Sequence, residues 1–78
     1  MSQKQSKKML RIGELAKASG VRASTIKFYS EIGILPFEQE STRLARRYDE
    51  VKVIRRLKEI KKLREKGSSV EEIIRQLK

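Results

Sequence analysis

Residues 11–35 read RIGELAKASGVRASTIKFYSEIGIL, and this stretch decides the fold. In its first part, three apolar residues recur at i, i+3 and i+4, so one face of a short helix can be buried; they are Ile12, Leu15 and Ala16. Gly20 ends this helix, because glycine adopts the left-handed conformation of a C-terminal cap more easily than other residues. The pattern predicts a first helix over residues 12–18.

A second helical pattern predicts a helix over residues 23–32. Gly33 ends it, and Pro36 prevents its continuation because the residue before a proline disfavours the α region. Two short helices joined by a tight turn form a helix-turn-helix, whose second helix is shaped to lie in a DNA major groove. The apolar face of that helix is formed by Ile26, Ile32 and either Tyr29 or Phe28.

The charge of the chain indicates the kind of partner. Its 78 residues make one small domain with a formal net charge of +10. Residues 1–11 hold four bases with no acid, and residues 51–66 hold eight bases beside Glu59 and Glu65. A positive field of this kind attracts polyanions and speeds their association. Together with the helix-turn-helix pattern, it predicts a nucleic acid as the partner.

Several classes of function are disfavoured by what the sequence lacks. It has no cysteine and no histidine, hence no disulfide, no thiolate metal site and no histidine base, so we expect no catalytic residue, no metal and no cofactor. No apolar run approaches the roughly 20 residues that span a bilayer, and residues 1–10 lack the apolar core of a signal peptide. We expect a non-enzymatic, cytoplasmic, nucleoid-associated protein without a membrane partner.

Residues 36–48 contain no helical period, and such a segment between helices is typical of a short β-hairpin, or wing. No Asn-Gly or Gly-Gly turn marks the hairpin. Tyr48 is expected to close the wing onto the helical core. The bases of the wing cluster near its return strand, where they can reach phosphates or a minor groove: Arg43, Arg46 and Arg47.

Two more amphipathic helices are predicted after the wing. Asp49 is a good N-cap for the third helix, and Ser69 begins the fourth with a capping box that ends at Glu72. The apolar stripe of the third helix recurs at every third residue: Val51, Ile54, Leu57, Ile60 and Leu63. The apolar face of the fourth comprises Val70, Ile73, Ile74 and Leu77.

The predicted fold class is mainly α, a winged helix-turn-helix of about four helices with a short β-hairpin wing between the second and third. This domain is expected to cover residues 10–78, preceded by a disordered basic arm at residues 1–9. A chain of this size buries only about 60% of its unfolded surface, so its stability should be modest.

Six short motifs resemble, in order and spacing, the N-terminal DNA-binding domain of MerR-type transcription regulators. They read IGELAK, GV, TIKFY, EIGILP, RRY and GSSVEEI, and lie at residues 12–17, 20–21, 25–29, 31–36, 46–48 and 67–73. The resemblance covers about residues 10–77, nearly the whole chain. It implies a winged helix-turn-helix with further helices packed behind it, and DNA contacts by Thr25, Lys27, Phe28, Tyr29, Arg46 and Arg64.

Three features depart from the family pattern. Arg22 stands where the family usually has serine at the N-cap of the second helix; it cannot accept the free N–H bonds there, which costs about 1 kcal/mol, but it can direct its guanidinium at a phosphate. Leu44 and Ala45 stand where a Gly-Tyr pair commonly precedes the wing arginine, so a tyrosine contact to the DNA backbone is absent. The sequence stops at Lys78, where the family continues with a long coiled-coil helix and an effector-binding domain, so we expect no small-molecule effector site within this chain.

The candidate DNA contacts lie on the second helix, the wing and the third helix. One of the two aromatic residues is expected to pack in the core, and the helical spacing makes Tyr29 the more inward of them. Most bases of the third helix are expected to form a solvated face. A hydroxyl or a cation early in a recognition helix can reach phosphates or base edges. The full set is Arg22, Ser24, Thr25, Lys27, Phe28, Tyr29, Arg43, Arg46, Arg47 and Arg64.

The function that fits best is sequence-specific binding of double-stranded DNA by a bacterial or phage transcription regulator of MerR type that lacks an effector domain. The first alternative is a small architectural DNA-binding factor of the excisionase type. An RNA-binding module is a further alternative, disfavoured by the lack of an aromatic β-sheet signature, and a protein–protein adaptor is the last. Assembly as a homodimer or head-to-tail on DNA stays open.

Overall fold

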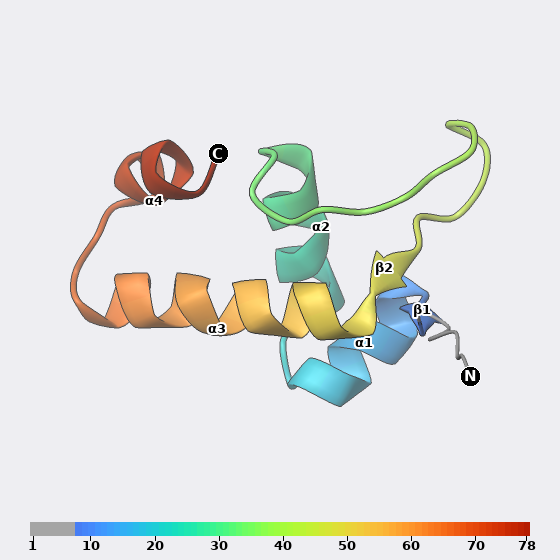
Figure 1. The fold of residues 1–78 in the computed structure, drawn as a ribbon, viewed down its shortest axis with the longest axis horizontal. Coiled ribbons are helices and arrows are strands. Elements are labelled where there is room, and N and C mark those ends of the chain that lie inside the picture. Colours follow the sequence, from blue (N-terminus) through green and yellow to red (C-terminus); the bar gives the residue numbers. More distant parts are fainter. Residues whose placement is uncertain (1–7) are drawn as a thin grey trace, which may run out of the picture.

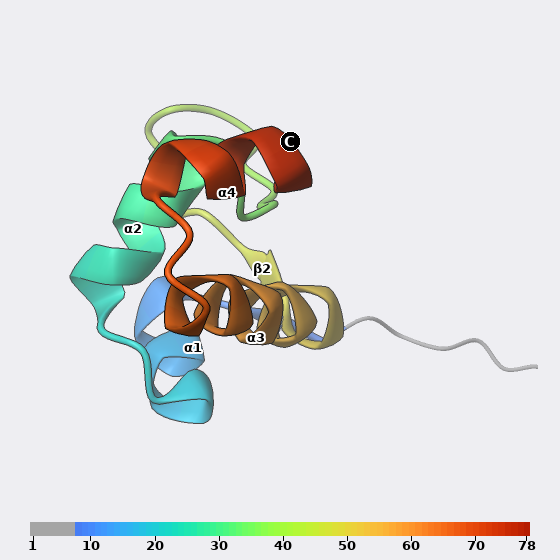
Figure 2. The ribbon, with the colours of Figure 1, turned by 90° about the vertical axis from the view of Figure 1, so that its left-hand side faces the viewer.

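Four helices and two short strands make up the protein, whose computed structural model describes residues 8–78. Figures 1 and 2 show α3 as the longest helix, with α1 on one side of it and the upper parts of α2 and α4 on the other. This confirms the mainly helical fold class. In chain order the elements are β1 (Met9–Leu10), α1 (Ile12–Ser19), α2 (Ala23–Glu31), β2 (Tyr48–Asp49), α3 (Glu50–Glu65) and α4 (Val70–Leu77).

The turn between α1 and α2 forms as the sequence predicts. Gly20 has φ 75°, and its N–H donates to the carbonyl of Ala16 at 2.9 Å, which is a left-handed C-terminal cap. The hydroxyl of Ser19 accepts from the N–H of Val21 at 3.1 Å and so fixes the start of the connection. Helix α1 ends one residue later than predicted and α2 one residue earlier.

The core lies where α1, α2 and α3 meet. In α3 the predicted stripe is wrong at its first position, because Val51 is 64% exposed whereas Val53 is completely buried. A step of three residues turns a helix by about 300°, so a stripe with that step drifts around the surface. Burial at i, i+4 and i+7 keeps to one face, and α3 follows that spacing with Val53, Leu57 and Ile60.

The wing is simpler than a regular hairpin. Its two arms share one antiparallel residue pair, in which Glu38 and Arg47 exchange two backbone hydrogen bonds of 2.8 Å. The return arm continues as β2, which pairs with β1 through Met9 opposite Asp49 and Leu10 opposite Tyr48. Met9 thus belongs to a strand and not to the predicted arm, the rest of which, apart from Lys8, lies outside the described residues.

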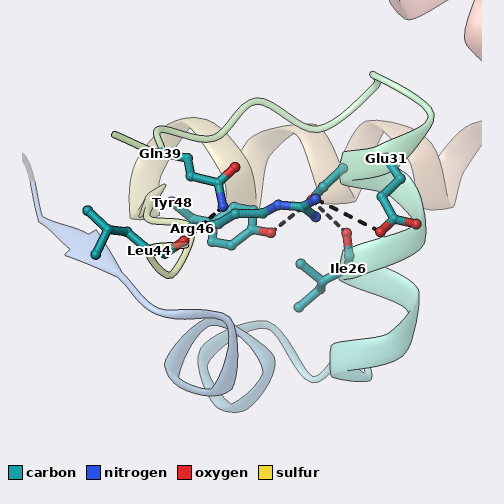
Figure 3. Close-up of polar contacts among 7 residues, drawn as sticks. Ile26, Glu31, Gln39, Leu44, Arg46 and Tyr48 are labelled. Carbon is teal, nitrogen blue, oxygen red and sulfur yellow. Dashed lines mark hydrogen bonds and ion pairs between the residues drawn. The ribbon is translucent and has the colours of Figure 1, made fainter. Parts of the chain in front are cut away.

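Tyr48 joins the base of the wing to α2, as its predicted core position required. The ring is fully buried, and its hydroxyl lies 2.9 Å from the hydroxyl of Ser30. The single hydroxyl proton of Ser30 is donated to the carbonyl of Ile26 at 2.8 Å, so Tyr48 must be the donor to Ser30. Figure 3 shows Tyr48 and Ile26, the two residues at the ends of this series of hydrogen bonds.

Helix α4 is attached by an arginine that the sequence pattern placed on a solvated face. Nη1 of Arg56, in α3, donates to the carbonyl of Leu77 at 3.1 Å and to the carbonyl of Ile34 at 3.3 Å. It therefore ties the last turn of α4 to the segment after α2. The predicted capping box begins α4, since the hydroxyl of Ser69 accepts from the N–H of Glu72.

Two further findings concern the helices. Asp49 caps α3 as predicted, because its carboxylate accepts from the N–H of Lys52 at 3.2 Å. Within the described part of the chain, no helix is both long and apolar enough to cross a membrane.

Replacement of Arg56 tests its role in attaching α4 to the rest of the fold. Arg56→Ala should lower the free energy of unfolding by about 1–2 kcal/mol, because it removes two hydrogen bonds to backbone carbonyls from a charged donor. Urea unfolding followed by circular dichroism measures the change. The neighbouring exposed Arg55 is the matched control, and Arg55→Ala should change the free energy by less than about 0.5 kcal/mol. Equal losses in both variants would contradict the assigned role.

Candidate nucleic-acid interface

The outward face of α2 carries the residues expected to read DNA. Arg22, Ser24 and Lys27 are exposed, and Thr25 is half-buried at the edge of the face. The opposite face is formed by the buried residues of α2, which are Ile26, Tyr29 and Ser30. The helix therefore presents polar and cationic side chains outward from a fixed position on the core.

The start of α2 has no side-chain cap, as expected for arginine at the N-cap. Arg22 adopts an extended conformation, φ −63° and ψ 143°, without a capping hydrogen bond, and no acidic residue occupies the first turn. The free N–H groups and the positive end of the helix dipole are suited to an anion. A phosphate at this position would accept hydrogen bonds from these N–H groups, and the N-cap residue itself, Arg22, carries a positive charge.

The two adjacent aromatic residues of α2 point in different directions. Phe28 is 46% exposed, whereas Tyr29 is 6% exposed, which confirms that Tyr29 is the more inward of the two. The hydroxyl of Tyr29 accepts a hydrogen bond from Nη1 of Arg64 at 3.1 Å. Tyr29 therefore lies in the core, and it links α2 to the C-terminal part of α3.

The three wing arginines divide into two groups. Arg43 and Arg47 are exposed, whereas the side chain of Arg46 is only 25% exposed. The Arg46 guanidinium lies 4.6 Å from the centre of the Phe37 ring, and its Nη2 is 3.9 Å from a carboxylate oxygen of Glu31. Figure 3 shows Arg46 reaching toward Glu31 at the end of α2. The structure thus leaves two candidate phosphate contacts exposed and places the third, half-buried, against Phe37 and Glu31.

A groove of about 700 Å³ lies between α1, α2 and the wing. Its apolar residues include Ile12, Leu44 and Ala45, and its charged residues are four cations, Arg11, Lys17, Lys27 and Arg46, with one acid, Glu14. An apolar wall beside cations is suited to the sugars and phosphates of a nucleic-acid backbone. The sequence did not single out Arg11 or Lys17, because only tertiary packing places them beside Lys27.

Comparison with known proteins identifies relatives over most of the chain. A family model described as MerR HTH family regulatory protein matches residues 10–78. The chain is 40% identical over 63 residues to a mercuric resistance operon regulatory protein of Bacillus cereus, and 41% identical over 64 residues to one of Serratia marcescens. It is 42% identical over 65 residues to the nodulation protein NolA of a Bradyrhizobium strain.

These matches cover the chain and the relatives unequally. They include 81%, 82% and 83% of this chain but only 47%, 44% and 27% of the three relatives. The chain therefore spans less than half the length of each of these curated relatives. No solved structure gave a significant match.

Substitution of Arg22 separates capping from DNA contact. Arg22→Ser supplies a hydroxyl that can accept the free N–H bonds of α2, so the free energy of unfolding should rise by about 1 kcal/mol. Duplex affinity should fall in the same variant, because a cation near the helix start is lost. Arg22→Ala is the control: it should weaken duplex binding equally without the gain in stability. Unchanged affinity in both variants would remove Arg22 from the interface.

Proposed function

The chain belongs to the MerR family of helix-turn-helix regulatory proteins, and from this premise we propose that residues 10–78 bind double-stranded DNA sequence-specifically to regulate transcription. The observation that carries the proposal is the exposed polar and cationic face of α2 beside the cationic groove. The relatives named as regulators of a mercuric resistance operon support a role in gene regulation.

In this proposal α2 enters the major groove and reads base edges. Lys27 is exposed halfway along α2 and reaches base edges or phosphates, and Ser24 and Thr25, three and two residues earlier, reach phosphates or bases. Phe28 contributes an apolar surface for a sugar or a thymine methyl group. Arg22 takes the phosphate at the uncapped start of the helix.

The wing supplies a second point of contact with the backbone. Arg43 and Arg47 are its exposed cations, and we place them on phosphates that flank the base-reading helix. Arg64 is held beside α2 by the hydroxyl of Tyr29, where it adds positive charge next to the recognition helix. Contacts on both sides of one groove would make affinity fall steeply with salt, with a slope of about −0.9 for each phosphate neutralised.

Selection of binding sites from random duplex DNA tests the proposal directly. We expect enrichment of one sequence, and we expect duplex DNA of that sequence to compete better than structured RNA of equal length at fixed salt. Equal competition by RNA would favour a nucleic-acid-binding module without this specificity. Sedimentation at several protein concentrations, with and without duplex, then measures whether the chain binds as a monomer, a homodimer or a head-to-tail assembly.

Lys27→Ala tests whether α2 reads bases. The affinity for the selected sequence should fall more than the affinity for random duplex, by about 1–3 kcal/mol of discrimination if Lys27 contacts a base edge. Fluorescence anisotropy with both duplexes measures the two losses. Ser68→Ala, at the α3–α4 turn and away from α2, is a control expected to leave both affinities unchanged. A uniform loss on both duplexes would reassign Lys27 to a phosphate.

A further inference from the structure

The side chain of Arg46 extends from the wing to the C-terminal end of α2. Its charge is paired with Glu31, and its guanidinium lies over the ring of Phe37. Phe37 in turn packs beside Tyr48, with ring centres 6.2 Å apart. The guanidinium thus has Phe37 on one face and Glu31 beside Nη2, and the side chain, 25% exposed, stays within this chain's own contacts on those two sides.

The end of α2 needs a positive charge that its own sequence does not provide. A helix C-terminus carries partial negative charge, and a carboxylate there is unfavourable. Glu31 is the last residue of α2, and no basic residue occupies its last turn. Arg46, fifteen residues further along the chain, brings a cation to this place at 3.9 Å from the carboxylate. The ion pair thus offsets the negative charge at the end of α2, whether or not a ligand is bound.

These contacts also fix the wing relative to the recognition helix. One attachment is the buried hydrogen bond from Tyr48 to Ser30, at the base of the wing. Arg46 supplies another, two residues earlier in the chain and toward the wing tip. The loop beyond it bonds to itself, as Nε2 of Gln39 donates to the carbonyl of Leu44 at 2.8 Å. The angle of the exposed arginines to α2 therefore depends on where Arg46 is held.

We propose that Arg46 is a positioning residue for DNA binding: its contacts with Glu31 and Phe37 set the spacing between α2 and the wing, and it makes no phosphate contact of its own. This inference rests on the proposed function. It assigns Glu31, an acid beside a DNA-binding surface, a favourable role in binding, although its charge alone would repel DNA.

Neutralising Glu31 distinguishes positioning from simple electrostatics by the sign of the effect. Glu31→Gln should weaken binding of the selected duplex about two- to fivefold, the range expected for loss of a partly exposed ion pair. If Arg46 instead contacted a phosphate, loss of the competing carboxylate would strengthen binding. Glu40→Gln is the matched control, an exposed wing acid without an ion pair among the described residues; it should bind equally well or slightly more tightly.

The salt dependence of binding gives a second readout that a loss of stability does not move. Arg46→Gln should weaken binding while leaving the slope of log K against log salt unchanged. Arg47→Gln, one residue away and exposed, should reduce the slope by about 0.9, the value for one phosphate. Affinities are measured at a temperature where circular dichroism shows every variant folded.

Each outcome decides one question. Weaker binding by Glu31→Gln together with an unchanged slope for Arg46→Gln supports positioning. Tighter binding by Glu31→Gln, or a slope reduced by about 0.9 in Arg46→Gln, overturns it and makes Arg46 a phosphate contact. Failure of the unsubstituted chain to bind any duplex would refute the proposed function itself, and that result is obtained before any variant is compared.

Discussion

The buried hydrogen bond between Tyr48 and Ser30 is the constraint on which the arrangement of the rest depends. A polar group taken out of water must find a partner, so this pair is satisfied in only a narrow range of geometries. Tyr48 also pairs with Leu10 in the small sheet and packs beside Phe37. The residue after it, Asp49, caps α3. Through its side chain, its backbone and its neighbour Asp49, Tyr48 thus connects the first strand, α2, the wing and the longest helix.

Much of the fold could be predicted from sequence because helix signals act within one or two turns. Gly20, Asp49 and Ser69 end or begin their helices through hydrogen bonds to residues at most four positions away. The exposed face of α2 followed from the helical period in the same way, including the more inward position of Tyr29. The chemistry of these positions is local, so no knowledge of tertiary contacts was needed.

What the sequence could not predict are contacts between residues far apart in the chain. Arg56 looks like any other base of α3, yet it donates to carbonyls 22 and 21 residues away. The choice between Val51 and Val53 depends on which side of α3 meets the core, and a step of three residues did not settle it. In the candidate interface, alternation along a strand separates Arg46 from Arg47 but does not say which faces the helix. Arg46 faces the helix because it pairs with Glu31, and no sequence motif identifies Glu31 as its partner.

The uncapped start of α2 has a consequence for how the protein responds to a ligand. Local opening requires the least free energy where hydrogen bonds are missing, and in α2 that place is the end beside Arg22. An anion bound there would slow amide hydrogen exchange in the first turn without moving any helix. The first turn of α2 would then be more mobile in the free protein than with an anion bound, and binding would change the dynamics of that turn without a change in the positions of the helices.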